Sequence, residues 1–575
     1  MTPAYPSSNA ICGGWVATLL VAWLLAPHPA AAQPPRAAPA PDNALPAAVA
    51  RALQQAQVPA AALAAMVLPA TAATAANAAT AANAAKATNA ATAAPSGRHS
   101  ASPRWQVQPD RPMPPASTLK LLTTVVALDR LGPNHRGFTD LLSAAALQGD
   151  VLAGDLVLRG GADPELGLAQ LGALLAELRW LGVREIAGDI VLDRQLFRPA
   201  LPDAATPPFD EWPELAYNVV PDALALTQNL MGLEISSQDA AQPGAVLARA
   251  LPPLPGVEMD ASALRLTDRP CRDWAEDWAS PPLRTEAAPG RLRIALRGGF
   301  PKDCTQRTGL ALIDRNALAE RHLRWVWQGL GGQWQGQVRD ADAPLVVAST
   351  ATQAAAPGNA EATEPAPATT PTTAETPPHA TPPPLRLLAR RWSRPWGELL
   401  RGMNKQSDNP SARLLYLSLG LAAMADQPTA ATADLAARSV LAWLDEQHIP
   451  TAGLVLDNGS GLSRSERITP RQMVMLLQAA QTSRWAPELM ASLPVAGVDG
   501  SMRHRLTTSR AAGWARLKSG SLKDVVALAG YVPDPKGRLW ALAAMVHHDQ
   551  ALAARPALDA LVDWVASGGM SRARP

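Results

Sequence analysis

The chain has few lysines. The sequence of 575 residues contains only seven of them among 51 Lys and Arg residues. Its ordinary positive charge therefore comes from arginine, whose guanidinium stays protonated in proteins and cannot act as a base. A lysine in this chain is consequently a residue to inspect for proton chemistry. Lys120 is the only lysine with a serine, Ser117, three residues before it.

The sequence also lacks an excess of charge of either sign. Its formal net charge of +2 predicts neither nucleic acid nor another acidic polymer as a partner. Beyond the first residues it lacks any apolar run of about 18 residues, the length that spans a bilayer. His547 and His548 have no evident third ligand, so we predict no metal site. The length allows two to four domains.

Cysteine is scarce, and its distribution matters because the first 32 residues resemble a secretory signal. Trp15 to Leu25 is a short apolar run, and Ala30-Ala31-Ala32 is typical of a cleavage site. No Lys or Arg precedes the run, which is unusual for such a segment. Removing residues 1–32 leaves only Cys271 and Cys304. In an exported chain two cysteines are more often paired than reactive, so we expect a disulfide.

The segment Pro114 to Leu128 organises the rest of the chain. Apolar residues recur in it at helical spacing and cover almost the whole circumference, which predicts a buried helix. Pro115 suits a helix start, which places Ser117 in the first turn and Lys120 one turn later on the same face. A desolvated lysine loses its proton easily and can then deprotonate the serine. The alternative is a capped structural helix with one snorkelling lysine.

Two further short motifs carry polar groups. Ser407-Asp408-Asn409 is predicted to form a turn between two helices, and Lys518-Ser519-Gly520 to lie on a strand, where the glycine would let a substrate backbone approach. Each motif alone is weak, because such residues are common at turns and strand ends. Four of the seven lysines (Lys120, Lys405, Lys518 and Lys523) nevertheless fall in or beside the three motifs.

Composition and periodicity also divide the chain into segments. Runs rich in Ala, Thr, Asn and Pro lack the apolar residues that a core needs, so we read two of them as low-complexity or disordered inserts. Val151 to Leu158 is predicted as one strand, residues 159–164 as a turn, and Ile186 to Leu192 as another strand. The predicted segments are a signal peptide at 1–32, a flexible lead-in at 33–47, the first part of the main domain at 48–135 with a low-complexity insert at 69–99, an inserted α+β subdomain at 136–235, an inserted β-rich subdomain at 236–315, a return segment at 316–348, a disordered insert at 349–384, the second part of the main domain at 385–568 and a tail at 569–575.

The order Ser-x-x-Lys, Ser-x-Asn, Lys-[Ser/Thr]-Gly resembles that of the penicillin-recognising serine acyl enzymes. Ser117 and Ser407 are 290 residues apart (407 − 117), far more than class A β-lactamases allow. This large insertion is similar to that of the low-molecular-mass class C penicillin-binding proteins, the D-alanyl-D-alanine carboxypeptidase/endopeptidases of the S13 peptidase family. Further stretches also resemble this family, namely residues 154–161, 188–193, 217–218, 403–405 and 457–462.

The resemblance implies an α+β fold of the β-lactamase/transpeptidase type, an antiparallel sheet flanked by helices, with large inserted subdomains. It also implies roles for the motif residues. Ser117 would be the nucleophile, Lys120 its base, and Ser407 the proton relay to the leaving amine. The substrate would be bound by Asn409, Lys518, Ser519, Gly520 and Ser521, and the backbone N–H groups of Ser117 and Ser521 would form an oxyanion hole.

Two positions depart from the family pattern. Ser519 stands where threonine is common, which keeps the hydroxyl. Arg413 stands where the family often has glutamate, which puts a contact at a helix surface in doubt but leaves the chemistry intact.

The activity implied by the resemblance is penicillin-sensitive hydrolysis of peptidoglycan stem peptides in the periplasm through an acyl-enzyme, without a cofactor. The balance between carboxypeptidase and endopeptidase activity stays open, as do the oligomeric state and the role of the inserted subdomains. Two alternatives remain: a β-lactamase or esterase on the same scaffold, and a non-catalytic cell-wall-binding protein.

Overall fold

The computed structural model of the chain describes residues 44–71, 104–202, 208–238, 245–278, 282–288, 290–343, 345 and 384–572. The predicted signal peptide at 1–32 lies outside these residues, as does nearly all of the predicted inserts at 69–99 and 349–384. Within the described ranges, no helix has both the length and the apolar character that crossing a membrane requires.

A five-stranded antiparallel sheet forms the centre of the catalytic part. Its strand order is β18-β19-β20-β1-β2, so the first strands of the chain pair with the last. The middle strands are buried on both faces, which explains why their sequences are continuous apolar runs with no alternation. The strands are β1 (Leu63–Pro69), β2 (Trp105–Val107), β18 (Arg516–Leu522), β19 (Val525–Pro533) and β20 (Leu539–His547).

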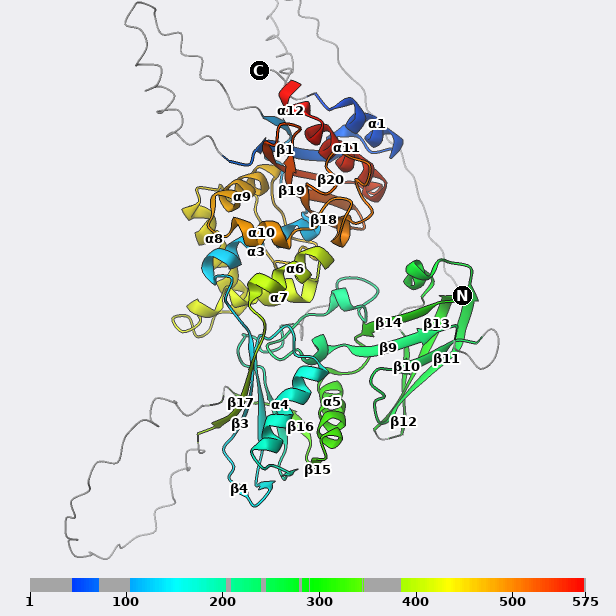
Figure 1. Ribbon diagram of the computed structural model, residues 1–575, viewed down its shortest axis with the longest axis vertical. Helices are drawn as coiled ribbons and strands as arrows, with labels where there is room; N and C mark the ends of the chain where they lie inside the picture. The colour runs from blue at the N-terminus through cyan, green and yellow to red at the C-terminus, as the bar shows by residue number, and fades with distance from the viewer. Residues whose placement is uncertain are drawn as a thin grey trace, which may run out of the picture. The chain divides into compact units, whose positions relative to one another are not determined.

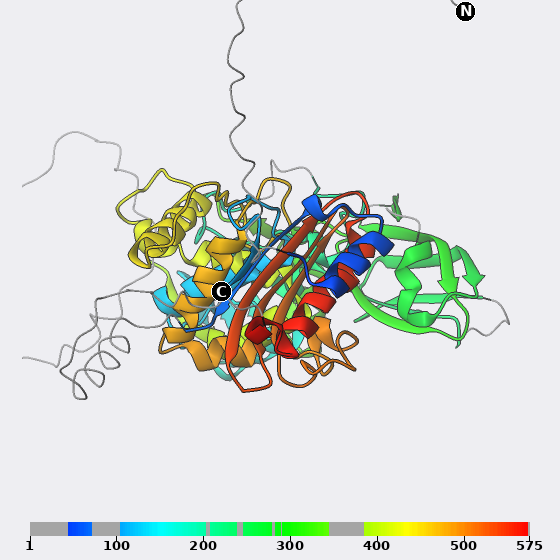
Figure 2. The same ribbon diagram turned by 90° about the horizontal axis from the view of Figure 1, so that it is seen from above.

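Helices cover both faces of this sheet (Figures 1 and 2). One face packs against α1 (Ala47–Gln55) and α11 (Arg555–Ala566), which enclose one apolar core with the short α12 (Gly569–Arg572). The other face packs on a larger core. The helices that contribute to it or flank it are α3 (Lys120–Arg130), α6 (Trp396–Gln406), α7 (Asn409–Ser418), α8 (Thr432–Glu446), α9 (Pro470–Thr482) and α10 (Ala486–Ser492). The buried helix α3 is therefore held between the sheet and the other helices.

A third core belongs to the segment between the first and second motifs. Its sheets have the orders β16-β8-β6-β3-β17 and β15-β7-β5-β4, and α4 and α5 pack against them. The elements are β3 (Phe138–Ser143), β4 (Leu147–Gln148), β5 (Val151–Leu152), β6 (Leu156–Gly161), α4 (Leu168–Trp180), β7 (Glu185–Ile186), β8 (Ile190–Asp193), α5 (Arg315–Gly329), β15 (Gln333–Trp334), β16 (Val338–Asp340) and β17 (Arg386–Trp392).

Three predictions in this region were wrong in detail. The run 151–158 forms two strands, β5 and β6, in different sheets, and 186–192 likewise divides into β7 and β8. The break occurs where Asp155 accepts a hydrogen bond from the Asp189 backbone at 2.8 Å. The predicted turn at 159–164 begins inside β6, because Gly160 packs in the strand against Ala223, where a Cβ would lie 2.3 Å from the carbonyl oxygen.

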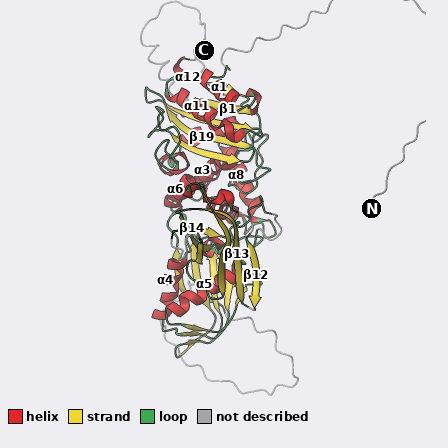
Figure 3. Ribbon diagram, turned by 90° about the vertical axis from the view of Figure 1, so that its right-hand side faces the viewer, coloured by secondary structure: helices red, strands yellow, loops and turns green. Residues whose placement is uncertain are grey.

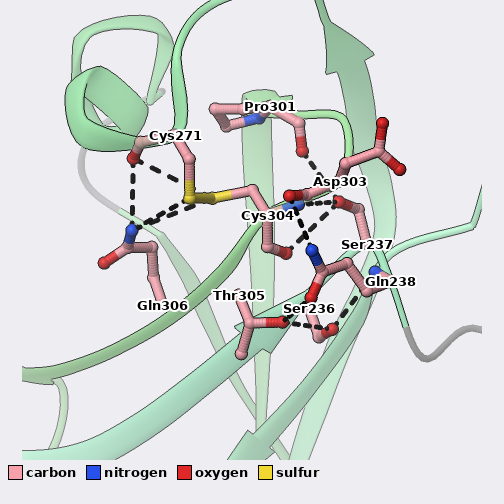
Figure 4. Close-up of a disulfide and its surroundings, with 9 residues drawn as sticks. All are labelled: Ser236, Ser237, Gln238, Cys271, Pro301, Asp303, Cys304, Thr305 and Gln306. Carbon is pink, nitrogen blue, oxygen red and sulfur yellow. Dashed lines mark hydrogen bonds between the residues drawn. A yellow bond between two sulfur atoms is a disulfide. The ribbon is translucent and has the colours of Figure 1, made fainter.

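A β-rich part follows, with two three-stranded sheets of order β10-β9-β14 and β11-β13-β12 around one core. Cys304 belongs to this core and forms a disulfide with Cys271, which packs against it; their Cα atoms are 5.3 Å apart (Figure 4). The strands are β9 (Met231–Ser236), β10 (Leu247–Ala250), β11 (Val257–Thr267), β12 (Leu283–Ala288), β13 (Arg291–Pro301) and β14 (Thr305–Leu310). The mixture of helices and separate sheets (Figure 3) is that of an α+β protein.

Candidate active site

Ser117 lies on a short 3-10 turn, Ala116–Leu119, immediately before α3. The α-helix itself begins at Lys120 and not at Pro115 as predicted. Ala116 has a φ of +44°, a left-handed backbone conformation that a non-glycine residue adopts only under local constraint. The constraint includes β18, because a Cβ on Gly520 would lie 2.8 Å from the Ser117 nitrogen. Gly520 thus lets the strand approach the turn of Ser117, while the approach of a substrate backbone at this glycine stays a prediction.

Lys120 is fully buried, and its ammonium nitrogen has three oxygen neighbours. The nitrogen donates to Ser117 Oγ at 3.0 Å, to Asn409 Oδ1 at 2.6 Å and to the Ser460 carbonyl at 2.6 Å. All three acceptors are neutral, so none of them holds the proton as strongly as a carboxylate would. The lysine and serine that the sequence pairs by spacing are therefore in hydrogen-bond contact.

The electrostatic setting of Lys120 makes the loss of its proton easier than it is for a lysine in water. Burial holds the pKa of Lys120 well below its usual value, and the positive charge of Lys518 lowers it further. Asp408 and Glu466 oppose the shift, because a negative charge stabilises the ammonium. A lysine in this state can accept a proton from a hydroxyl, which is the chemistry of a general base.

The second motif lies where two helices meet, as predicted. Ser407 ends α6 with a φ of +62°, and Asp408 caps α7 by accepting a hydrogen bond from the Ser411 N–H at 3.1 Å. Asn409 is the first residue of α7, so its side chain is fixed at a helix start. Its amide donates to the Tyr217 carbonyl at 3.0 Å while its oxygen accepts from Lys120.

The third motif lies on β18, and Lys518 connects it to the second. The Lys518 nitrogen donates to Ser407 Oγ and to the Ser519 carbonyl, both at 2.8 Å. Burial lowers the pKa of Lys518 to about 7. The fraction of molecules in which Lys518 is charged therefore falls as the pH rises through neutrality. The Ser519 hydroxyl donates to Ser501 Oγ at 2.7 Å, and Ser521 continues the same strand with an exposed side chain.

The structure thus brings the three motifs together. Several partners were missed by the sequence reasoning: the carbonyls of Ser460 and Tyr217 and the hydroxyl of Ser501. Residues 457–462 and 217–218 were among the stretches that resemble the family, but residue type does not show which backbone carbonyl contacts a catalytic group. The prediction that Arg413 lies at a helix surface was wrong, because its side chain is buried. It is 7% exposed and donates to the carbonyls of Val219 and Leu462, both at 3.4 Å.

A cavity of about 530 Å³ is lined by Arg413 and Tyr416 of α7, and none of the residues of the three motifs lines it. It lies between α7, the loop after Asp457 and the segment around Asn218. Its walls combine apolar side chains with charges of both signs, including Arg413, Asp457 and Arg464. The cavity can therefore hold a group that carries both apolar and charged atoms.

A comparison with protein families decides which class this arrangement represents. The D-Ala-D-Ala carboxypeptidase 3 (S13) family matches residues 72–357 and 372–567. The chain belongs to the S13 family. As an S13 member it is a serine-type D-Ala-D-Ala carboxypeptidase, a peptidase and hydrolase, which confirms the predicted family and enzyme class.

Two D-alanyl-D-alanine carboxypeptidases are similar to most of the chain. A D-alanyl-D-alanine carboxypeptidase from Actinomadura sp. strain R39 is 29% identical over 438 residues, covering 74% of this chain and 72% of the relative. The D-alanyl-D-alanine carboxypeptidase DacB of Haemophilus influenzae is 26% identical over 432 residues, covering 73% of this chain and 78% of that protein.

The crystal structure of penicillin binding protein 4 from Haemophilus influenzae supports the fold. It aligns with a TM-score of 0.62 at 21% identity, covering 90% of this S13 chain and 99% of that one. A structure of the same protein in complex with a β-lactam aligns with a TM-score of 0.57 at 22% identity. These matches confirm the predicted α+β fold of the β-lactamase/transpeptidase type.

Proposed function

We propose that the chain removes the terminal D-alanine from peptidoglycan stem peptides through an acyl-enzyme on Ser117. The observation that carries the proposal is the contact of 3.0 Å between the Lys120 nitrogen and Ser117 Oγ inside a buried site. Lys120 takes the hydroxyl proton while Oγ attacks the carbonyl carbon of the penultimate D-alanine. The backbone N–H groups of Ser117 and Ser521 stabilise the oxyanion that forms.

The leaving amine receives its proton from Ser407. This hydroxyl accepts a hydrogen bond from Lys518 at 2.8 Å, which orients it. It passes to the amine the proton that Lys120 took from Ser117, so Lys120 is neutral again and Lys518 keeps its charge. Asn409 uses one amide hydrogen for Tyr217, which leaves the second for the substrate amide. Water then attacks the acyl-enzyme, and Lys120 serves again as the base.

The free carboxylate of the substrate is bound by Lys518 and the Ser519 hydroxyl. A β-lactam carries a strained amide and a carboxylate in the same relation, so it acylates Ser117 as an inhibitor. The same residues serve an endopeptidase reaction when the scissile D-alanyl bond belongs to a crosslink between two stem peptides.

Two further inferences concern the whole chain. Residues 1–32 direct export to the periplasm, where the substrate lies. Residues 136–348 are insertions into a catalytic domain that is formed by 48–135 and 385–568. Both inferences rest on composition and on the order of the motifs in the sequence.

Purified protein incubated with crosslinked and uncrosslinked muropeptides tests the proposed reaction. We expect release of free D-alanine, detected by mass spectrometry, and no release by Ser117→Ala. Cleavage of the crosslinked peptide in addition would establish endopeptidase activity. Intact muropeptides of both kinds after long incubation with folded wild-type enzyme would contradict the proposal.

A further inference from the structure

Glu466 is a carboxyl group buried beneath the loop Asp457–Gly461, from which the Ser460 carbonyl reaches Lys120. Its side chain is inaccessible to solvent. Its Oε1 accepts hydrogen bonds from the backbone N–H groups of Asn458 at 3.0 Å and Gly459 at 2.9 Å. Two consecutive peptide groups of the loop are therefore fixed by one carboxylate oxygen.

The opposite side of the loop is fixed by the segment that carries the catalytic pair. Thr123 of α3 donates to the Gly459 carbonyl at 2.6 Å, and Lys120 donates to the next carbonyl, that of Ser460, at 2.6 Å. Gly461 packs against the backbone of Ala116, where a Cβ would lie 1.9 Å from the carbonyl oxygen. The loop is thus clamped between Glu466 and the turn of Ser117.

The titratable groups that interact with Glu466 come from three elements. Burial raises the pKa of Glu466 to about 7, and Asp457 of the loop adds to the rise, while the backbone donors oppose it. Tyr416 of α7 also interacts with Glu466: burial raises the pKa of the Tyr416 phenol, and the negative charge of Glu466 raises it further. Lys120 of α3 is the cation that responds, because the charge of Glu466 counteracts the effect of burial on the pKa of Lys120.

We propose that Glu466 is a positioning residue for acylation. It holds the Ser460 carbonyl against Lys120, and in its ionised form it stabilises the Lys120 ammonium that forms as Ser117 loses its proton. The inference rests on the proposed function and adds a residue that acts through the loop. The proton moves from Ser117 Oγ to Lys120 Nζ, and Glu466 neither gives nor takes one in this step.

Two substitutions separate the two parts of this role. Glu466→Gln keeps an oxygen that accepts the two N–H groups but removes the charge. Glu466→Ala removes both and leaves buried N–H groups without an acceptor. Asp193→Asn is a matched control, since Asp193 is another buried carboxyl with a pKa raised by burial, on β8 of the inserted region.

The experiment measures the second-order acylation rate with labelled penicillin from about pH 5.5 to about pH 8.5, the range over which a group with a pKa near 7 titrates. We expect the wild-type rate divided by the Glu466→Gln rate to be about 1 at the acidic end of this range and roughly 3 to 10 at the alkaline end. The midpoint of this increase should lie near the pKa of Glu466. Glu466→Ala should lose roughly 10- to 100-fold at every pH, because the base is misplaced. Asp193→Asn should follow the wild type.

Other results would overturn the inference. A ratio for Glu466→Gln that does not change with pH would remove the electrostatic role, and so would an equal pH dependence in Asp193→Asn. A folded Glu466→Ala variant as fast as wild type would remove the positioning role. If the alanine variant does not fold, the Gln ratio alone decides. A wild type that penicillin does not acylate at Ser117 would instead refute the proposed function, and with it this inference.

Discussion

The Lys120 nitrogen lies 2.6 Å from Oδ1 of Asn409, although 289 positions separate the two residues in the sequence. This contact joins the first motif to the second and places a neutral amide oxygen beside the amine. Together with the Ser460 carbonyl it orients the nitrogen toward Ser117 without the full charge of a carboxylate. The arrangement suits a lysine that must alternate between its neutral and protonated forms.

Replacing Lys120 by arginine tests its assignment as the base. The guanidinium keeps the charge and approximate length but cannot take the serine proton, so acylation by penicillin should slow by roughly 10²–10⁴-fold. Lys518→Arg keeps the charge that we assign to binding the carboxylate and should lose less. Circular dichroism establishes that both variants are folded. Equal losses, or a milder effect at position 120, would mean that Lys120 acts only as a fixed charge.

The pH dependence tests the role of Lys518. Because burial lowers the pKa of Lys518 to about 7, the free enzyme loses this positive charge as the pH rises through that value. Binding of a carboxylate should weaken accordingly. Arginine at position 518 keeps its charge, so the ratio of Lys518→Arg to wild-type acylation rates should increase on the alkaline side of pH 7. A ratio that stays constant would show that Lys518 remains charged or does not meet the carboxylate.

The disulfide should stabilise the β-rich part of the chain. Cys271 and Cys304 close a loop with a sequence separation of 33, for which the chain-entropy estimate is roughly 3–4 kcal/mol. The double substitution of both cysteines by alanine should lower the free energy of unfolding of that part, measured by denaturant titration. Penicillin acylation at low denaturant should persist. An unchanged unfolding midpoint would contradict the expected contribution.

The resemblance to a known family predicted the α+β class, and apolar periodicity predicted the buried helix after Ser117, because helical periodicity is a local signal. The scarcity of lysine indicated Lys120 as a candidate base, and the order of the three motifs carried the resemblance to the family. The sequence could not predict that Gly154-Asp155 and Gly188-Asp189 would separate strands, since that depends on a contact between Asp155 and the Asp189 backbone.

The partners of the catalytic groups were equally hidden from the sequence. A carbonyl such as that of Ser460 has the same chemistry at every position of the chain. The burial of Arg413 and Glu466 runs against the usual preference of charged residues for solvent. Such positions become visible only when long-range packing is known.

The central claim is that Ser117 is the nucleophile. Labelling the folded protein with penicillin, followed by proteolysis and mass spectrometry, tests it most directly. Our account predicts one covalent adduct, located on Ser117, and no adduct in a folded Ser117→Ala variant. An adduct on another residue, or equal labelling of the alanine variant, would contradict the account.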